Sequence, residues 1–210
     1  MTQGRFITFE GGEGAGKSTQ LRRLVARLAQ GREVVATREP GGSPGAESIR
    51  DLLVNGAADR WSPVTETLLM YAARRDHVER VITPALSRGA WVVCDRFADS
   101  TRAYQGAAGG VDPGLISTLE AQVLGQARPD LTLVLDLPAD IGLARAAGRA
   151  GGETRFESKG AAFHLRLRDA FLAIAAADPG RCHVIDAAAP VEGVGAAIWT
   201  AVQERLGLRG

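Results

Sequence analysis

The sequence has few of the residues that mark disulfide-bonded, metal-bound or membrane-inserted proteins. Its 210 residues include only two cysteines, Cys94 and Cys182, which lie far apart and outside any CxxC or His-rich spacing. We expect both to be small core residues. No apolar run approaches the roughly 18 residues of a membrane span, and the start, MTQGRFITFE, lacks the charged and apolar regions of a signal peptide. These absences predict a cytoplasmic protein with no membrane contact.

An excess of charge is also missing, and lysine is scarce. The net charge is +1 and the pI about 7.9, so no overall field predicts binding to nucleic acid. Only Lys17 and Lys159 are lysines, whereas the other 23 of the 25 basic residues are arginines. A lysine at position 17 therefore suggests a role for a compact charge that the broad guanidinium fork would not fill.

Residues 11–19, GGEGAGKST, match the phosphate-loop spacing G-x-x-x-x-G-K-[ST]. A short strand (5–10) precedes them, and apolar residues at helical spacing follow over 18–31. Glycine lets backbone N–H groups approach a phosphate, and a helix N-terminus adds partial positive charge. The competing interpretation is a glycine-rich helix start without a ligand. We predict an ATP-binding loop of these residues: Gly11, Gly12, Glu13, Gly14, Ala15, Gly16, Lys17, Ser18 and Thr19.

Five apolar segments, at 5–10, 33–39, 91–95, 131–137 and 182–186, are predicted strands. Predicted helices alternate with them: 18–31, 46–54, one long helix from 63 to about 87, then 113–125, 138–148, 161–177 and a segment from 190. This alternation indicates an α/β fold with a parallel sheet covered on both faces, most simply one domain over 1–210. Ligands should bind where the loops after positions 10, 39, 95 and 137 converge.

Two features near these loops could carry chemistry. Asp95 ends a strand, as expected of an acid that orders Mg²⁺, and Arg96 follows it. Alternatively, Asp95 only caps the next segment and Arg96 only pairs with it. The stretch 145–155 is glycine-rich and basic, which suits a flap that closes over negative charge; a plain solvated loop is the alternative.

Six segments in order resemble bacterial thymidylate kinases along nearly the whole chain: FEGGEGAGKSTQ, TREPGG, LLMYAARRDHVERVITPAL, VVCDRFADSTRAYQGAAGG, RPDLTLVLDL and RFES. TREPGG together with DRF…ST.AYQG is specific to that family. The resemblance implies transfer of the γ-phosphoryl group of ATP to dTMP, giving dTDP and ADP for dTTP synthesis, with Mg²⁺. It also implies a P-loop NTPase-type three-layer sandwich, a small lid at about 148–160, and usually a homodimer.

The resemblance also implies roles for individual residues. Lys17 and the loop amides would hold the ATP phosphates, with Ser18 and Asp95 at the metal and Arg96 bridging donor and acceptor phosphates. On the dTMP side, Glu13 would contact the 3′-hydroxyl, Arg74 the thymine edge and Tyr104 the C2′ position. Gln105 would lie near the base, Arg50 near the dTMP phosphate, and Arg38 would hold the loop after the second strand.

Two positions vary in the family. Some relatives carry an arginine at the position of Gly14, whereas others have glycine there and place catalytic arginines in the lid; this chain resembles the latter, so Arg149 and Arg155 are expected to be catalytic. Where relatives usually stack a phenylalanine on thymine, this chain has Met70. Tyr71 should not substitute, because neighbours on a helix point about 100° apart. Two interpretations of Met70 follow: it packs on the base, or both it and Tyr71 are core residues.

Two other functions remain open. The chain could phosphorylate another small acceptor, such as dUMP, UMP or shikimate, in which case Arg74, Tyr104 and Gln105 would have no pyrimidine to contact. It could also be a nucleotide-dependent switch. A GTPase switch should carry N-K-x-D, but the sole asparagine, Asn55, is followed by glycine. Arg102 is given no role.

Overall fold

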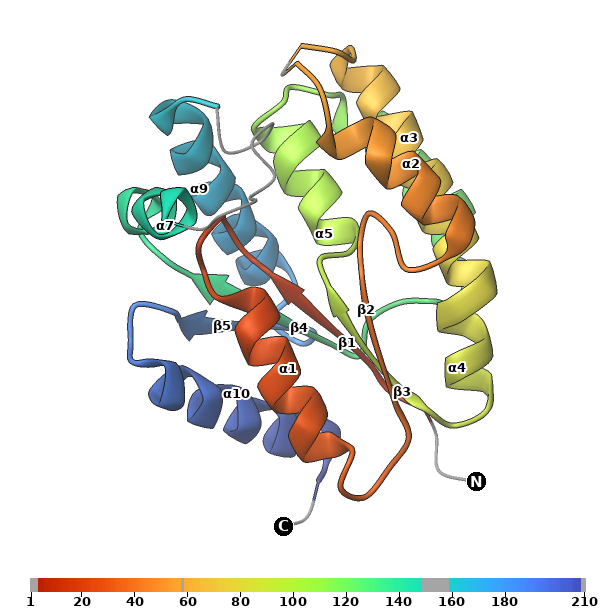
Figure 1. Cartoon of the computed structure of the whole chain (residues 1–210), viewed down its shortest axis with the longest axis vertical. Helices are drawn as coiled ribbons and strands as arrows, with labels where there is room; N and C mark the ends of the chain where they lie inside the picture. Colours follow the sequence, from red (N-terminus) through yellow and green to blue (C-terminus); the bar gives the residue numbers. More distant parts are fainter. Residues whose placement is uncertain (1–3, 58, 149–158, 209–210) are drawn as a thin grey trace.

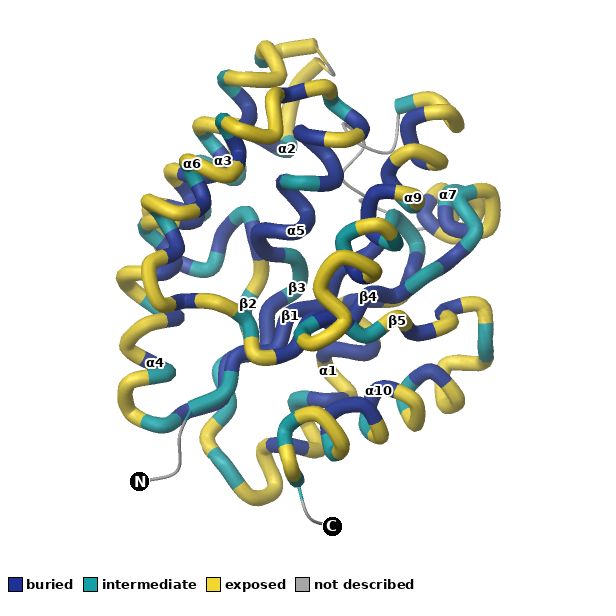
Figure 2. The backbone as a smooth tube through the Cα atoms, turned by 180° about the vertical axis from the view of Figure 1, so that it is seen from behind, coloured by how far each residue is buried: buried dark blue, intermediate teal, exposed yellow. Residues whose placement is uncertain are grey.

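The computed structural model describes residues 4–57, 59–148 and 159–208, which form a five-stranded parallel sheet with helices on both faces (Figure 1). The strands are β1 (Phe6–Glu10), β2 (Val34–Arg38), β3 (Trp91–Asp95), β4 (Leu131–Asp136) and β5 (Cys182–Asp186), in the order β2-β3-β1-β4-β5. The three central strands are almost wholly buried, because helices cover both of their faces (Figure 2). The predicted fold class is confirmed, and each predicted strand end is correct within one residue.

One face of the sheet is covered by α1 (Lys17–Leu28) and α10 (Val191–Leu206), which lie side by side (Figure 1). Side chains alternate along a strand, so Ile7 and Phe9 pack against these two helices while Phe6 points to the opposite face. There Phe6 meets the ring of Phe97 edge-on, with 4.9 Å between centroids. Hydrophobic clusters on both faces of the sheet therefore fix β1, and with it the start of the phosphate loop.

On the second face lie α2 (Pro44–Val54), α3 (Pro63–His77), α4 (Thr83–Ser87) and α6 (Pro113–Leu124). The predicted long helix from 63 to about 87 is continuous but not uniform, because the π-helical segment η1 (Val78–Ile82) separates α3 from α4. Pro84 has no N–H to donate to the preceding turn, and just before it Thr83 N–H bonds to Val78 O, a wider spacing than in an α-helix. α2 begins two residues before the predicted start.

A buried helical segment follows β3 that the sequence patterns do not predict. It consists of α5 (Ala98–Thr101) and the π-helical η2 (Arg102–Ala107). Its sequence, ADSTRAYQGA, mixes polar and small residues without an apolar stripe. Asp99, Ser100, Thr101 and Gln105 are nevertheless buried, because each has polar partners in the interior. The segment is thus helical through tertiary contacts.

The chain after β4 forms α7 (Ala139–Ala147) and, after the interval 149–158, α9 (Ala161–Ala177). Both helices lie beside the phosphate loop (Figure 1). Most of the expected lid at about 148–160, with Arg149 and Arg155, lies outside the described residues. Cys94 and Cys182 are buried free thiols, as predicted. Within the described ranges, each helix is too short or too polar to cross a bilayer.

Candidate active site

The loop between β1 and α1 has the backbone of a phosphate-binding loop. Gly11, Gly14 and Gly16 all have positive φ, at 130°, 67° and 85°. Two of them also lack space for a side chain, since a Cβ on Gly11 would lie 2.4 Å from Leu135 O and one on Gly14 would lie 2.0 Å from Gly142 O. Only glycine fits these positions without strain, and without side chains there the backbone N–H groups of the loop can approach a phosphate at the start of α1.

Lys17, the first residue of α1, folds back over this loop. Its Nζ donates to the carbonyl oxygens of Gly11 (3.1 Å) and Gly12 (2.8 Å). Burial and the positive charge of Arg96 together lower the pKa of this amine to about 8, although the negative charges of Glu13 and Asp95 oppose the shift. A nearby anion would relieve both costs. The scarce lysine thus lies where a phosphate would be bound.

Ser18 and Asp95, the two predicted metal-site residues, contact each other across the loop. Ser18 Oγ donates to Asp95 Oδ2 at 2.6 Å, joining the first turn of α1 to the end of β3. A hydroxyl and a carboxylate oxygen are the donors that Mg²⁺ prefers, so this pair fits an ion held jointly with phosphate oxygens. In the described part of the chain there is no cluster of three His, Cys, Asp or Glu residues that could hold a metal alone.

Arg96 lies at the centre of the site with a left-handed backbone (φ 67°), rare for a residue with a side chain. Its Nη1 donates to Gly11 O (3.0 Å), and its Nη2 to Glu13 Oε1 (2.9 Å). The guanidinium also lies over the ring of Tyr104, 4.9 Å from the centroid. The ion pair is therefore made with Glu13, and the interpretation in which Arg96 pairs only with its neighbour Asp95 is wrong.

Glu13 and Tyr104 share this cluster. Tyr104 Oη donates to Glu13 Oε1 at 2.6 Å, the oxygen that also accepts from Arg96. Burial raises the pKa of Glu13, but the charges of Arg96 and Lys17 and the Tyr104 hydrogen bond outweigh it and hold the pKa at about 2. Glu13 is thus a fixed carboxylate at neutral pH, able to accept hydrogen bonds from a ligand.

Two further predicted arginines, Arg38 of β2 and Arg50 of α2, form hydrogen bonds around the loop that follows β2. Arg50 Nη1 donates to Pro40 O (2.5 Å), and Arg38 Nη2 donates to Glu47 Oε2 (3.1 Å). Glu47 in turn accepts from Gly42 N, so Glu47 links Arg38 to the loop after β2. Burial lowers the pKa of Arg50, and the positive charges of Arg38 and Arg96 lower it further. This concentration of like charge favours a bound anion.

Arg74 of α3 is 2 % exposed, and most of its donors are used internally. Nε donates to Glu39 Oε2 (2.7 Å), while Nη2 donates to Phe97 O and Thr101 Oγ1, each at 3.0 Å. The remaining nitrogen, Nη1, has no hydrogen-bond partner among the described residues. It is the donor on Arg74 that could serve a base edge.

Two other predicted acceptor-site residues, Met70 and Gln105, are buried. Met70 packs in one buried cluster with Tyr104, whereas Tyr71 belongs to a different cluster with Phe97. This confirms that Tyr71 does not share the direction of Met70. Gln105 Nε2 donates to Glu66 Oε1 (2.8 Å) in the interior, so a contact between Gln105 and a base would use its other polar atom.

Some residues of the site were missed in the sequence. Glu10 is fully buried at the end of β1 and accepts from Phe97 N (2.8 Å) and Ser100 Oγ (2.5 Å), which fixes the chain after Arg96. Glu39 directly follows β2 and accepts from Arg74 Nε at 2.7 Å. Glu10 ends its strand as Asp95 does, and Glu39 comes one residue later, so the strand-end signal that singled out Asp95 could have found both. His164, buried in α9, had no such signal.

This geometry defines a class. A glycine-rich loop with a lysine and a serine at a helix start, a strand-end aspartate and several arginines around one edge of a five-stranded parallel sheet are the parts of a P-loop phosphotransferase. The family profile for thymidylate kinase matches residues 9–198. The chain belongs to the thymidylate kinase family.

Individual relatives agree with this assignment. The chain is 69 % identical to the thymidylate kinase of Caulobacter vibrioides over 209 residues, covering 99 % of this chain and all of that one. It is 55 % identical to the enzyme of the same name from Nitrobacter winogradskyi over 206 residues, covering 97 % and 90 % of the two chains. The crystal structure of thymidylate kinase from Ehrlichia chaffeensis superposes with a TM-score of 0.78 at 35 % identity, covering 96 % and 99 %.

Proposed function

We propose that this chain transfers the γ-phosphoryl group of ATP to dTMP, giving dTDP and ADP for dTTP synthesis. The observation that carries the proposal is the position of Arg96, whose guanidinium joins the carbonyl of Gly11 in the phosphate loop to Glu13 and Tyr104 on the acceptor side. A cation there can contact the donor and acceptor phosphates together. Because phosphoryl transfer requires positioning and charge neutralisation more than covalent help, this is a catalytic position.

On the donor side, Lys17 and the loop amides bind the ATP phosphates. Ser18 and Asp95 would hold Mg²⁺, directly or through its water ligands, and a bound ion would supply positive charge beside the phosphate oxygens. Arg149 and Arg155 of the lid add positive charge to the transferred group. Replacing either with alanine should lower kcat more than it raises the KM for ATP, whereas equal effects on both would indicate simple phosphate anchoring.

On the acceptor side, Arg50 and Arg96 bind the dTMP phosphate, and Arg38 supports the loop beside it. Nη1 of Arg74 donates to the thymine edge, Met70 packs near the ring and Gln105 lies behind it. Glu13 accepts a hydrogen bond from the 3′-hydroxyl, and the ring of Tyr104 excludes a 2′-hydroxyl. The fixed charge of Glu13 and its hydrogen bond with Tyr104 support both of these roles.

The family resemblance further supports a homodimer of single P-loop domains with a lid at about 148–160. Light scattering coupled to size exclusion would test the dimer by giving the mass of two 22.1 kDa chains. Use of ATP, together with two buried free thiols, supports a cytoplasmic location.

The proposed function is tested by a coupled ADP-release assay with ATP and Mg²⁺. The purified protein would be offered dTMP, dUMP, UMP, dCMP and shikimate separately. Strong preference for dTMP is expected. Preference for another acceptor would overturn the base specificity but keep the phosphate loop, and hydrolysis independent of acceptor would favour a nucleotide-dependent switch.

A further inference from the structure

The acceptor side of the phosphate loop contains a buried imidazole that the proposed function leaves without a role. His164 lies in the first turn of α9 and is 4 % exposed. Its Nε2 is buried without a hydrogen-bond partner among the residues that the structure describes. A buried polar atom without a hydrogen bond lowers the stability of the folded protein. Such an atom therefore needs an explanation, and a hydrogen bond to a bound ligand is one.

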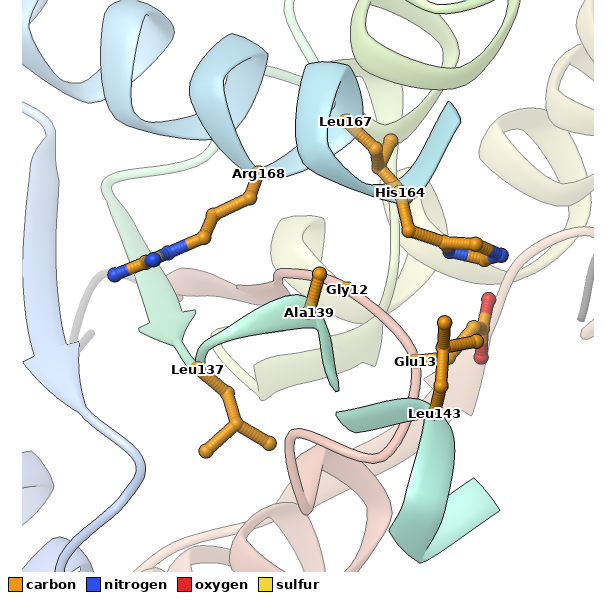
Figure 3. A pocket seen from close by; sticks show the side chains of 8 residues that line it. All are labelled: Gly12, Glu13, Leu137, Ala139, Leu143, His164, Leu167 and Arg168. Carbon is orange, nitrogen blue, oxygen red and sulfur yellow. The ribbon is translucent and has the colours of Figure 1, made fainter. Parts of the chain in front are cut away.

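The side chain of His164 points toward Glu13. Figure 3 shows both residues lining one small cavity, with the imidazole directed at the Glu13 carboxylate. Arg168, one turn further along α9, points away from it and forms a bidentate pair with Asp136 at 2.7 and 2.9 Å. Leu137, Leu143 and Leu167 supply apolar walls. His164 is therefore the group on α9 that is free to act beside Glu13.

Only one of the two carboxylate oxygens of Glu13 accepts hydrogen bonds from the described residues. Tyr104 and Arg96 both donate to Oε1, at 2.6 and 2.9 Å, and Oε2 has no donor within the described part of the chain. The same corner thus combines an ionised acceptor that lacks a donor with an imidazole nitrogen that lacks a partner. A carboxylate can only accept, so a group that fits between them must donate to Glu13. A hydroxyl group can donate its proton there and still accept at its oxygen.

We propose that Nε2–H of His164 donates a hydrogen bond to the 3′-oxygen of the acceptor nucleotide while the 3′-hydroxyl donates its proton to Glu13. This assignment rests on the proposed function, in which Glu13 contacts that hydroxyl. It makes His164 a specificity-determining residue for the 3′-hydroxyl of the acceptor. A site with two fixed partners for one hydroxyl strongly rejects a substrate that lacks it, because both partners are then left buried and unpaired.

The test measures kcat/KM for dTMP and for its 3′-deoxy analogue in the unaltered enzyme and in two variants. His164→Phe keeps the ring but removes both nitrogens, whereas His164→Gln places an amide donor where Nε2 was. We expect His164→Phe to lose about 10- to 100-fold with dTMP and less than threefold with the 3′-deoxy analogue. His164→Gln should recover part of the loss with dTMP. Comparing the two substrates within each variant cancels any loss of folded protein.

His183→Phe is the matched control, since it makes the same substitution on the edge strand β5 and should leave the ratio between the two substrates unchanged. Equal losses of His164→Phe with both substrates, or no loss with either, would overturn the contact while leaving the proposed function intact. If the unaltered enzyme phosphorylates neither nucleotide, the proposed function itself fails, and the contact fails with it.

Discussion

At the scale of single residues, Arg96 and Arg102 are close in sequence but differ in their surroundings, because only Arg96 contacts the phosphate loop. Arg96 lies among the carbonyl of Gly11, the carboxylate of Glu13 and the ring of Tyr104. We expect Arg96→Ala to remain folded yet lose about 10³-fold or more in kcat, because a cation that spans transferring phosphates can contribute that much. Steady-state ADP release, with circular dichroism to check folding, would measure this. Near-normal turnover would contradict the bridging role.

Arg102 is the control for that experiment. Its guanidinium forms a bidentate pair with Glu120 of α6, at 2.8 and 2.7 Å, away from the phosphate loop. Arg102→Ala leaves Glu120 buried without this partner, so we expect a loss of about 1–3 kcal/mol in unfolding free energy. The kcat of the folded variant should be unchanged. The pair of variants separates a loss of chemistry from a loss of stability.

Part of this site could be predicted from the sequence because some of its residues follow local sequence rules. Lys17, Ser18 and Asp95 follow local rules, a loop spacing and a strand end, and the structure brings all three together. Arg74 became a candidate only through the family resemblance, and its partner Glu39 lies 35 residues away in sequence. His164 could not be predicted, because its proximity to Glu13 depends on how α9 packs against the phosphate loop. Contacts across the sheet have no local pattern.

At the scale of elements, the phosphate loop and α7 pack so closely that Gly14 and Gly142 have no space for a side chain where they meet. A Cβ on Gly142 would lie 2.4 Å from Glu13 O, just as one on Gly14 would lie 2.0 Å from Gly142 O. Gly142→Ala must therefore push α7 or the loop aside. We expect it to lower the unfolding free energy by about 1–3 kcal/mol and to reduce kcat/KM, because the displaced carbonyl belongs to the loop that binds phosphate.

The helix α10 offers a matched control for this substitution. Gly193 also lies in the first turn of its helix, but a Cβ there would meet no atom within 4 Å. Gly193→Ala should raise the unfolding free energy by roughly 0.4–1 kcal/mol, because alanine restricts the unfolded chain more than glycine does. Chemical denaturation of both variants would test the pair. If both were stabilised, the two elements would not interlock.

The same scale shows where prediction from sequence succeeds. The strands and amphipathic helices were placed within one to three residues, the largest error being the end of α1, since their apolar periodicity reflects burial directly. α5 and η2 were missed because their buried side chains are polar and satisfied by distant partners: Asp99, for example, binds Arg181, 82 residues further on. The long helix was predicted as uniform, because its apolar pattern continues through the π-helical segment. The wider backbone hydrogen-bond spacing of the π-helical segment could not be recognised in the apolar pattern.

At the scale of the whole molecule, buried carboxylates make stability depend on pH in opposite ways. Burial, reinforced by the charge of Asp99, raises the pKa of Glu10 to about 7, although the Ser100 hydrogen bond and the charge of Arg96 oppose this. The folded chain therefore binds a proton that the unfolded chain, with a pKa near 4.5, releases earlier. Stability due to Glu10 is complete below about pH 4.5 and falls as the pH rises through 7.

Glu10→Gln removes this titration while keeping an acceptor oxygen for Phe97 N or Ser100 Oγ. Relative to the unaltered chain, the variant should gain on the order of 3 kcal/mol in unfolding free energy between pH 5 and pH 8. Glu13→Gln is the control of opposite sign. The pKa of Glu13 is lowered to about 2, so its contribution is complete above about pH 4.5 and is lost only as the pH falls toward 2. Its effect should change much less between pH 5 and pH 8 than that of Glu10→Gln. Urea unfolding of the three proteins at both pH values would decide the matter, because a constant difference for Glu10→Gln would mean that this carboxyl is already ionised at pH 5.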